Sequence, residues 1–136
     1  MRYIGLDVGT KRIGIAVSDA LNMTAQGIES YTVTEDLEQD LDHIIEVSEK
    51  YKPYTYVMGL PKNMNGTLGP MSEKIKGIAA RLEEKSGAKV ILWDERLTTV
   101  SAERMLIGAD LTRKKRRKVV DKIAAVIILQ SYIDGI

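Results

Sequence analysis

The 136-residue sequence contains no cysteine and only one histidine. The absence of cysteine excludes disulfide bonds, thiol catalysis and zinc sites built from cysteine. No apolar run reaches the roughly 20 residues that span a membrane, and the first residues show neither the apolar segment nor the cleavage site of a secretion signal. We therefore expect a cytoplasmic protein without a membrane partner, folded as one domain over residues 1–136.

Two common phosphate-binding patterns are also missing. The segment at residues 59–70, GLPKNMNGTLGP, is rich in glycine but fits neither GxxxxGK[ST] nor GxGxxG. It is typical of an ordinary connection between a strand and a helix. The single histidine, His43, lies with Gln39, Asp40 and Glu46 on the charged side of a predicted helix, so we interpret it as a surface residue.

Charged residues are numerous but unevenly distributed. The net charge is only +1. Acidic residues gather between Glu35 and Asp42, whereas an unbroken basic run occupies positions 113–118: Arg113, Lys114, Lys115, Arg116, Arg117 and Lys118. Such a run is either a solvated surface loop or a binding site for a polyanion such as nucleic acid. The charge pattern alone leaves both interpretations open.

Alternation of apolar and polar residues predicts strands early in the chain, and helical periodicity dominates later. Tyr3–Asp19 is predicted to form a hairpin with Asp7 in its first strand, and Gly5, Gly14 and Ala16 are expected on the side of Asp7. The other expected elements are strands at Gly27–Val33, Tyr54–Met58 and Lys89–Trp93. Helices are expected after a cap at Thr34, from Pro70 to a cap at Gly87, before Gly108 and at Val119–Ile133. This order predicts an α/β fold with a five-stranded mixed sheet, its first three strands antiparallel, and helices on both faces.

Three carboxylates are candidates for a metal site. Asp7 lies in the first strand, Glu95 follows the fifth strand, and Asp121 lies in the last helix, one turn from Ala125. Carboxylates within about 4 Å of one another repel strongly, whereas Mg²⁺ favours carboxylate and water oxygens. Two such ions can bind the attacking and leaving oxygens of a phosphodiester. The plainer alternatives are a surface pair of Asp94 and Glu95 neutralised by Arg96, and an Asp121 that only complements its helix dipole.

Four segments together resemble the YqgF/RuvX family: DVGTKRIGIAVSD, GLPKNMNGTLGP, DERLTT and VDKIAA. They occur in the family's order, and the resemblance covers essentially the whole chain. It implies an RNase H-like three-layer fold. It also implies a nuclease that processes the 5′ end of pre-16S rRNA in ribosome biogenesis, with Holliday junction resolution in DNA recombination as the alternative.

The resemblance also implies roles for individual residues. Asp7, Glu95 and Asp121 would be the catalytic residues and would bind Mg²⁺ or Mn²⁺, with Asp94 as the alternative to Glu95. Nucleic-acid contacts are implied for Lys11, Arg12 and Arg96, and the run at 113–118 would add to them. Asn65 departs from the aspartate expected in the family's loop. The implied partners are structured RNA or branched DNA and the small ribosomal subunit, with the protein a monomer or weak homodimer.

Two further interpretations belong to other functional classes. Actin-like and sugar-kinase-like ATPases share the Asp-x-Gly-Thr hairpin, but they need two related domains and this chain has room for one. A non-catalytic RNA- or ribosome-binding protein could keep the same fold. The three carboxylates at positions 7, 95 and 121 argue against that second interpretation, although a fold does not by itself establish an activity.

Overall fold

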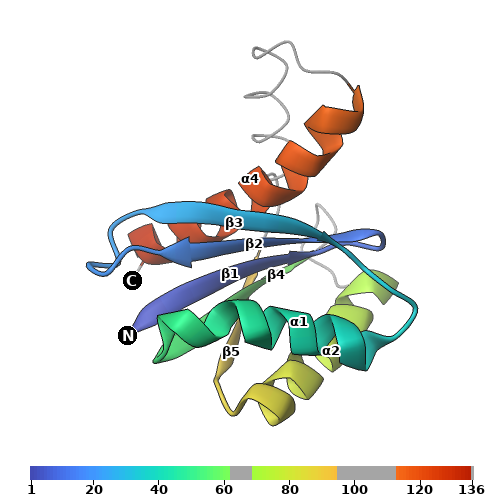
Figure 1. Cartoon of the computed structure of the whole chain (residues 1–136), viewed down its shortest axis with the longest axis horizontal. Helices are drawn as coiled ribbons and strands as arrows, with labels where there is room; N and C mark the ends of the chain where they lie inside the picture. The colour runs from blue at the N-terminus through green and yellow to red at the C-terminus, as the bar shows by residue number, and fades with distance from the viewer. Residues whose placement is uncertain (62–68, 95–112, 136) are drawn as a thin grey trace.

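The computed structural model describes residues 1–61, 69–94 and 113–135, and for residues 113–122 it describes the backbone alone. Five strands form one sheet in the order β3-β2-β1-β4-β5 (Figure 1). The strands are β1 (Arg2–Val8), β2 (Arg12–Ser18), β3 (Ala25–Thr32), β4 (Tyr54–Leu60) and β5 (Val90–Asp94). The first three strands are antiparallel to their neighbours among one another. Strand β4 runs parallel to β1, and β5 runs parallel to β4. The predicted mixed sheet is confirmed.

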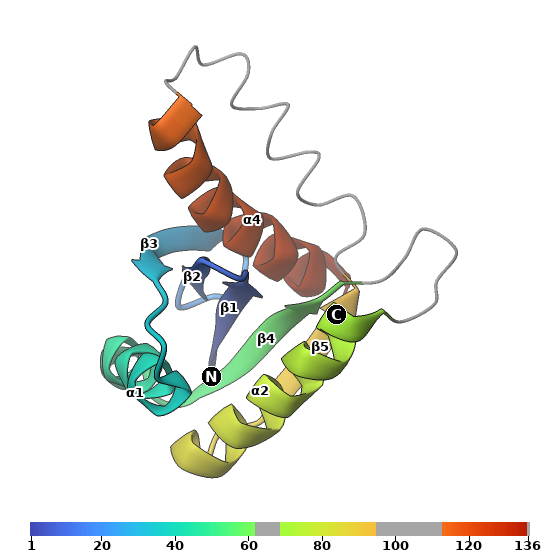
Figure 2. The same cartoon turned by 90° about the vertical axis from the view of Figure 1, so that its right-hand side faces the viewer.

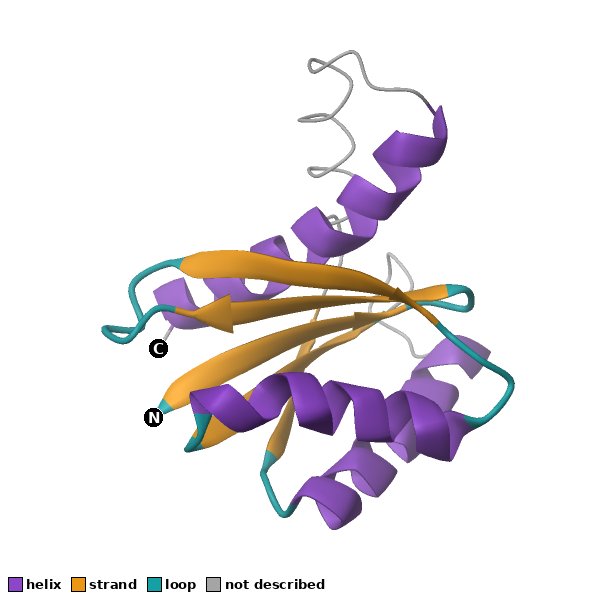
Figure 3. Ribbon diagram, viewed as in Figure 1, coloured by secondary structure: helices purple, strands orange, loops and turns teal. Residues whose placement is uncertain are grey.

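The described helices cover both faces of this sheet. They are α1 (Leu37–Ser48), α2 (Pro70–Ser86) and α4 (Arg113–Gly135), and a short 3-10 turn, Glu49–Tyr51, follows α1. Figure 2 shows α1 and α2 on one face and α4 on the other, and Figure 3 shows the same layers by element type. In the described part of the chain, no helix is both long enough and apolar enough to cross a membrane.

The hairpin of β1 and β2 has the predicted register. Asp7 lies opposite Gly14, and Gly5 lies opposite Ala16. Because directly paired residues point to the same face of a sheet, these four residues share one face, as the sequence indicated. Their neighbours, including Ile4, Leu6, Ile13 and Ile15, point to the other face and join the larger core under α1 and α2.

The face that carries Asp7 is covered by α4, at very short range. A Cβ atom added to Gly5 would lie 2.7 Å from Leu129 Cβ and 3.0 Å from the Ala125 carbonyl oxygen. The second core is formed here by Ala16, Val57, Ala125, Ile128, Leu129 and Ile133. The opposite side of α4, with Ile123, Val126 and Ile127, is only half-buried. The helix is therefore buried on the side that packs against the sheet.

Two helix starts differ from the prediction. Asp36, not Thr34, caps α1, because its side chain accepts hydrogen bonds from the backbone N–H groups of Glu38 and Gln39. The helix α4 begins at Arg113 rather than Val119, so the basic run forms its first turns. Arginine and lysine are good helix formers, which explains this extension. The start of α2 at Pro70 and its left-handed cap at Gly87 (φ 73°) agree with the prediction.

The side chain of Asp40 also departs from the expectation that it lies on an exposed, charged face. It is only 4% exposed. Its carboxylate accepts hydrogen bonds from the Thr34 N–H at 3.0 Å, the Thr34 hydroxyl at 2.8 Å and the Tyr31 hydroxyl at 2.9 Å. These donors compensate the burial of the charge. Asp40 thus fixes the connection between β3 and α1.

Candidate functional site

Asp7 lies near the carboxyl end of β1, in the centre of the sheet. It is half-buried and shares its face with α4. Ligand sites of open α/β sheets lie at the carboxyl ends of the strands, and β4 and β5 end at the same edge because they run parallel to β1. The next residue, Val8, points to the opposite face. The position of Asp7 is therefore typical of a functional carboxylate.

Two of the predicted phosphate-binding residues lie beside Asp7 on the hairpin turn. The turn is closed by a hydrogen bond from the Gly9 N–H to the Arg12 carbonyl at 2.9 Å. A Cβ at Gly9 would lie 2.9 Å from that carbonyl oxygen, so the tight turn requires glycine. Lys11 is exposed at the tip of the turn. Strand alternation from Gly14 places Arg12 on the face of Asp7.

The helix α4 runs antiparallel to β1 across this face. The Tyr132 ring packs edge-on against Tyr3 with 5.1 Å between the ring centroids. Two residues further along β1, Gly5 lies against Leu129 and Ala125. Position 121 is one helical turn N-terminal to Ala125, and its backbone belongs to α4. Its side chain lies outside the described part of the structure.

The predicted acidic residue after β5 cannot be placed in the same way. Glu95 and Arg96 lie outside the described residues. At the end of β5, the Trp93 indole N–H donates to the Ser131 hydroxyl of α4 at 3.0 Å. Leu92 packs instead against the core on the α1 and α2 side. Alternation therefore assigns Asp94 to the face of Leu92, away from α4.

Ser30 on β3 was not a candidate from the sequence. It pairs with Gly14, which pairs with Asp7, so the three residues form one row on the α4 face of the sheet. The Ser30 hydroxyl oxygen is buried and has no hydrogen-bond partner among the described residues. A buried hydroxyl without a partner is unfavourable and needs an explanation. Only the strand register reveals this relationship, and no sequence motif contains it.

No group of three or more His, Cys, Asp or Glu side chains among those described could hold a metal ion. Two of the three predicted ligands, Glu95 and Asp121, fall outside those side chains, and of the three only Asp7 is among them. The isolated histidine lies elsewhere. His43 stacks on Tyr31 with 4.2 Å between the ring centroids, and its Nε2 lies 2.8 Å from Glu29 Oε1. It is half-buried against β3 rather than a free surface residue.

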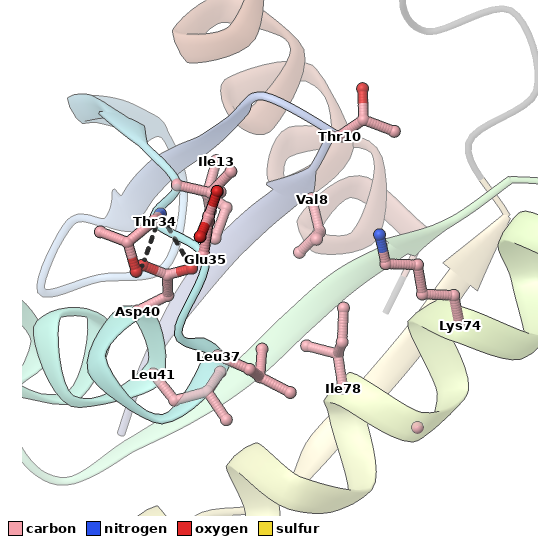
Figure 4. Close-up of a pocket in the computed structure, with 13 residues that line it drawn as sticks. Val8, Thr10, Ile13, Thr34, Glu35, Leu37, Asp40, Leu41, Lys74 and Ile78 are labelled. Atoms are coloured by element: carbon pink, nitrogen blue, oxygen red, sulfur yellow. Dashed lines mark hydrogen bonds between the residues drawn. The ribbon is translucent and has the colours of Figure 1, made fainter.

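A second feature is a pocket of about 440 Å³ on the opposite face, between the hairpin turn, the start of α1 and α2 (Figure 4). Its lining includes Val8, Thr10, Thr34, Asp40 and Lys74. Burial, with a smaller effect of the Asp40 carboxylate, raises the pKa of the Tyr31 hydroxyl that donates to Asp40. The polar wall of the pocket is therefore held by neutral Tyr31.

A family model described as "RuvX: Holliday junction resolvase" matches residues 1–135. The chain belongs to the RuvX family. A relative from Geobacillus kaustophilus (strain HTA426) is 55% identical and is covered over 99% of both chains. One from Halalkalibacterium halodurans is 54% identical, covering 98% of this chain and 96% of the relative. Both carry the name "Putative pre-16S rRNA nuclease".

Solved structures similar to this RuvX-family chain include RuvC of Thermus thermophilus. RuvC in complex with a Holliday junction substrate has a TM-score of 0.59 and 13% identity, covering 98% of this chain and 96% of RuvC. A second Thermus thermophilus RuvC structure has a TM-score of 0.53 and 14% identity, covering 98% of this chain and 97% of that one. At this identity the similarity shows the fold, which is the RuvC-like RNase H fold that the sequence predicted.

Proposed function

We propose that this RuvX-family nuclease hydrolyses phosphodiester bonds near the 5′ end of 16S rRNA precursors. Asp7, Glu95 and Asp121 are proposed as its catalytic carboxylates and as the ligands of Mg²⁺ or Mn²⁺. The observation that carries the proposal is the path of α4 along β1, from Tyr132 at Tyr3 to Ala125 at Gly5. Two strand residues advance about 6.6–6.8 Å and one helical turn 5.4 Å. This path supports the proposal that Asp121, one turn before Ala125, lies near Asp7.

The alternation of β5 supports Glu95 over Asp94 as the second carboxylate. Trp93 contacts α4 through Ser131 and Tyr132. If the alternation continues for two more residues, position 95 shares the face of Trp93 and of Asp7. Asp94 then belongs to the other face, and we assign it no metal-binding role.

The donor chemistry of this site fits a hard divalent cation. Carboxylate oxygens and water are the ligands that Mg²⁺ prefers. The buried Ser30 hydroxyl, which has no partner in the part of the chain that the structure describes, lies in the row of Asp7 with only Gly14 between them. A hydroxyl in this place can bind a water molecule of a hydrated ion. When bound, the ion supplies a nucleophilic hydroxide and neutralises charge on the phosphate oxygens.

The residues of the chain itself bind and orient the nucleic acid. Lys11 and Arg12 lie on the hairpin turn next to Asp7 and can contact phosphates on either side of the scissile bond. The basic run of α4 lies at the N-terminal end of the helix whose later turns pack against Gly5, two residues before Asp7. It can therefore hold a flanking segment of the same strand, and Arg96 is proposed to add a contact. The small ribosomal subunit is the proposed setting in which this RNA is presented.

Holliday junction resolution is the second candidate, because the family model carries that description. A resolvase must cut two strands symmetrically, which normally requires a two-fold dimer. Trimming one strand of an RNA precursor requires only one active site. We therefore give precedence to RNA processing by a monomer or weak homodimer.

The test compares cleavage of a pre-16S rRNA 5′ fragment and of a four-way DNA junction by wild type and Asp7→Asn, in Mg²⁺ and in Mn²⁺. Asp7→Asn keeps the side-chain shape and should abolish cleavage. Asp42→Asn is the matched control, because Asp42 is an exposed residue of α1 that pairs with Lys85. Cleavage by Asp7→Asn at the wild-type rate would show that the proposed site is wrong. Cleavage of the junction alone would favour the second candidate.

A further inference from the structure

The pocket on the α1 and α2 side combines an apolar interior with a polar rim (Figure 4). Its interior is lined by Ile13, Leu41 and Ile78, which are at most 7% exposed. Its rim carries Thr10, Thr34, Glu35 and Lys74. The nuclease mechanism uses none of these residues. Concave apolar sites with a few placed polar groups are the usual form of ligand pockets.

Gly77 gives this pocket part of its room. It lies in the middle of α2 and lines the pocket, and nothing lies within 4 Å of a Cβ atom added to it. Glycine is unfavourable inside a helix compared with alanine. No close packing requires glycine at this position. Gly77 is itself exposed, so the missing side chain leaves the mouth of the pocket open.

The wall opposite α2 is preformed. Asp40 holds Thr34 through both its N–H and its hydroxyl, and it also accepts from Tyr31. This network fixes the backbone before α1, where Glu35 and Leu37 line the pocket. Leu37 is 42% exposed although it is a large apolar residue. A fixed wall with an exposed leucine at the mouth suits a ligand that has a flat apolar surface.

We propose that this pocket receives the base of one unstacked nucleotide of the nucleic-acid substrate, next to the scissile phosphate. The inference rests on the proposed nuclease function and extends it to substrate recognition. A base has apolar faces that fit against Leu37 and Ile78. Its amino or imino N–H groups can donate to the Glu35 carboxylate. The Lys74 ammonium then contacts the phosphate of that nucleotide.

The position of the pocket relative to Asp7 supports this occupant. Asp7 and Val8 are consecutive residues of β1 on opposite faces, and Val8 lines the pocket. The turn at residues 9–12 connects the two faces, and Lys11 is exposed on it. A single strand that crosses this turn can leave one phosphate on the side of Asp7 and insert the neighbouring base on the side of Val8.

The experiment uses the full chain and single-stranded oligocytidine of about ten nucleotides, with one 2-aminopurine moved along its sequence. All binding is measured in EDTA, so that cleavage does not contribute. With wild type, the fluorescence of 2-aminopurine at one position of the oligonucleotide should increase on binding, because a base inserted into the pocket is no longer stacked on its neighbours. Gly77→Leu should abolish that signal and weaken binding about 5- to 150-fold, the range for one base contact. Gly77→Ala fills much less of the pocket and should bind nearly as wild type does.

Lys74 provides a second, independent arm. Lys74→Gln should weaken binding and lower the slope of log affinity against log salt by about 0.7, as expected when a single strand has one phosphate fewer bound by the protein. Lys76→Gln removes the same charge from the same helix outside the pocket lining. It should leave the slope unchanged.

Melting curves show whether each variant folds. Gly77→Leu should melt no lower than wild type, because its Cβ meets open space and leucine favours a helix more than glycine does. If Gly77→Leu binds the oligonucleotide as wild type does, the base-binding proposal is wrong, and the pocket is left to an apolar side chain of a protein partner. That result would not contradict the nuclease proposal, which is tested by the cleavage activity of Asp7→Asn. If Asp7→Asn loses cleavage while Gly77→Leu binds the oligonucleotide in EDTA as wild type does, the nuclease proposal stands and the base-binding proposal fails.

Discussion

Gly5 and Leu129 touch at a distance that leaves no room for a β-carbon on Gly5. This close approach brings the backbone of α4 against the centre of the sheet and sets the height of the helix above Asp7. The second obstacle to a side chain is the Ala125 carbonyl, which belongs to the backbone and cannot rotate away. Gly5 therefore determines how the two proposed metal-binding segments approach each other.

The first prediction compares two Gly→Ala substitutions. Gly5→Ala should lower the free energy of unfolding by about 1–3 kcal/mol, because the added methyl group overpacks the interface between sheet and helix. Gly77→Ala, at a site with nothing within 4 Å, should raise it by roughly 0.5–1 kcal/mol. Urea unfolding of both variants checks this. Equal effects of the same sign would mean that Gly5 does not set the position of α4.

The second prediction concerns Asp121. If it is a metal ligand, Asp121→Asn should leave the metal-free protein as stable as wild type or make it more stable, because carboxylate repulsion falls. It should also reduce the rise in melting temperature caused by Mg²⁺ or Mn²⁺. If Asp121 only complements its helix dipole, the substitution should cost about 0.3–1 kcal/mol without metal. The ion-dependent shift would then equal that of wild type.

The third prediction follows from the helical conformation of the basic run. Six positive charges in the first turns of α4 oppose its dipole and one another. Replacing Lys114, Lys115 and Arg117 with Gln should therefore raise helix content and melting temperature slightly. The same change should reduce the slope of log affinity against log salt by roughly 0.7–0.9 for each phosphate that the variant no longer binds. An unchanged slope would mean that the basic run is a solvated helix end that does not bind phosphates.

The fourth prediction is a decline of stability at alkaline pH. Burial raises the pKa of Tyr56 far above its ordinary value of 10.0, and its hydroxyl donates to Ser48 at 2.9 Å. Tyrosine is neutral in both states below that value. As pH rises above it, only the unfolded state releases the proton, so the free energy of unfolding falls.

The measurement is urea unfolding between pH 8 and about 11, around the ordinary tyrosine pKa of roughly 10. Tyr56→Phe should flatten the alkaline decline. At neutral pH it should cost only about 0.5–1.5 kcal/mol, because Ser48 still donates to the Ile44 carbonyl. A decline as steep in Tyr56→Phe as in wild type would assign the effect to other groups, of which Tyr31 and Tyr132 also have raised pKa values through burial.

Local patterns predicted the part of the fold that depends on local structure. The alternation in β1 and β2 correctly placed Asp7 beside Gly14, because a two-residue period admits one register for a buried face. Pro70 and Gly87 marked the ends of α2 for equally local reasons. The order of the elements predicted a mixed sheet with helices on both faces, and the family resemblance added that this arrangement is RNase H-like.

Features that depend on how side chains of different elements pack together were missed. Asp40 looked exposed because its neighbours in sequence are charged, and its burial depends on donors from Tyr31 and Thr34. The orphan hydroxyl of Ser30 and the pocket beside Lys74 likewise arise only when strands and helices pack. For the site itself, the structure places Asp7 and Arg12 on one face, while the assignments of Glu95 and Asp121 remain predictions.

The position of β1 at the middle of the sheet has a consequence for synthesis on the ribosome. This strand emerges early, whereas α4, which covers its Asp7 face, emerges late. Pairings between such distant segments form slowly. A nascent chain that lacks α4 presents Ala16 and Val57 uncovered, which exposes it to association with other chains. It also lacks Asp121, so the proposed nuclease cannot act before α4 has been synthesised.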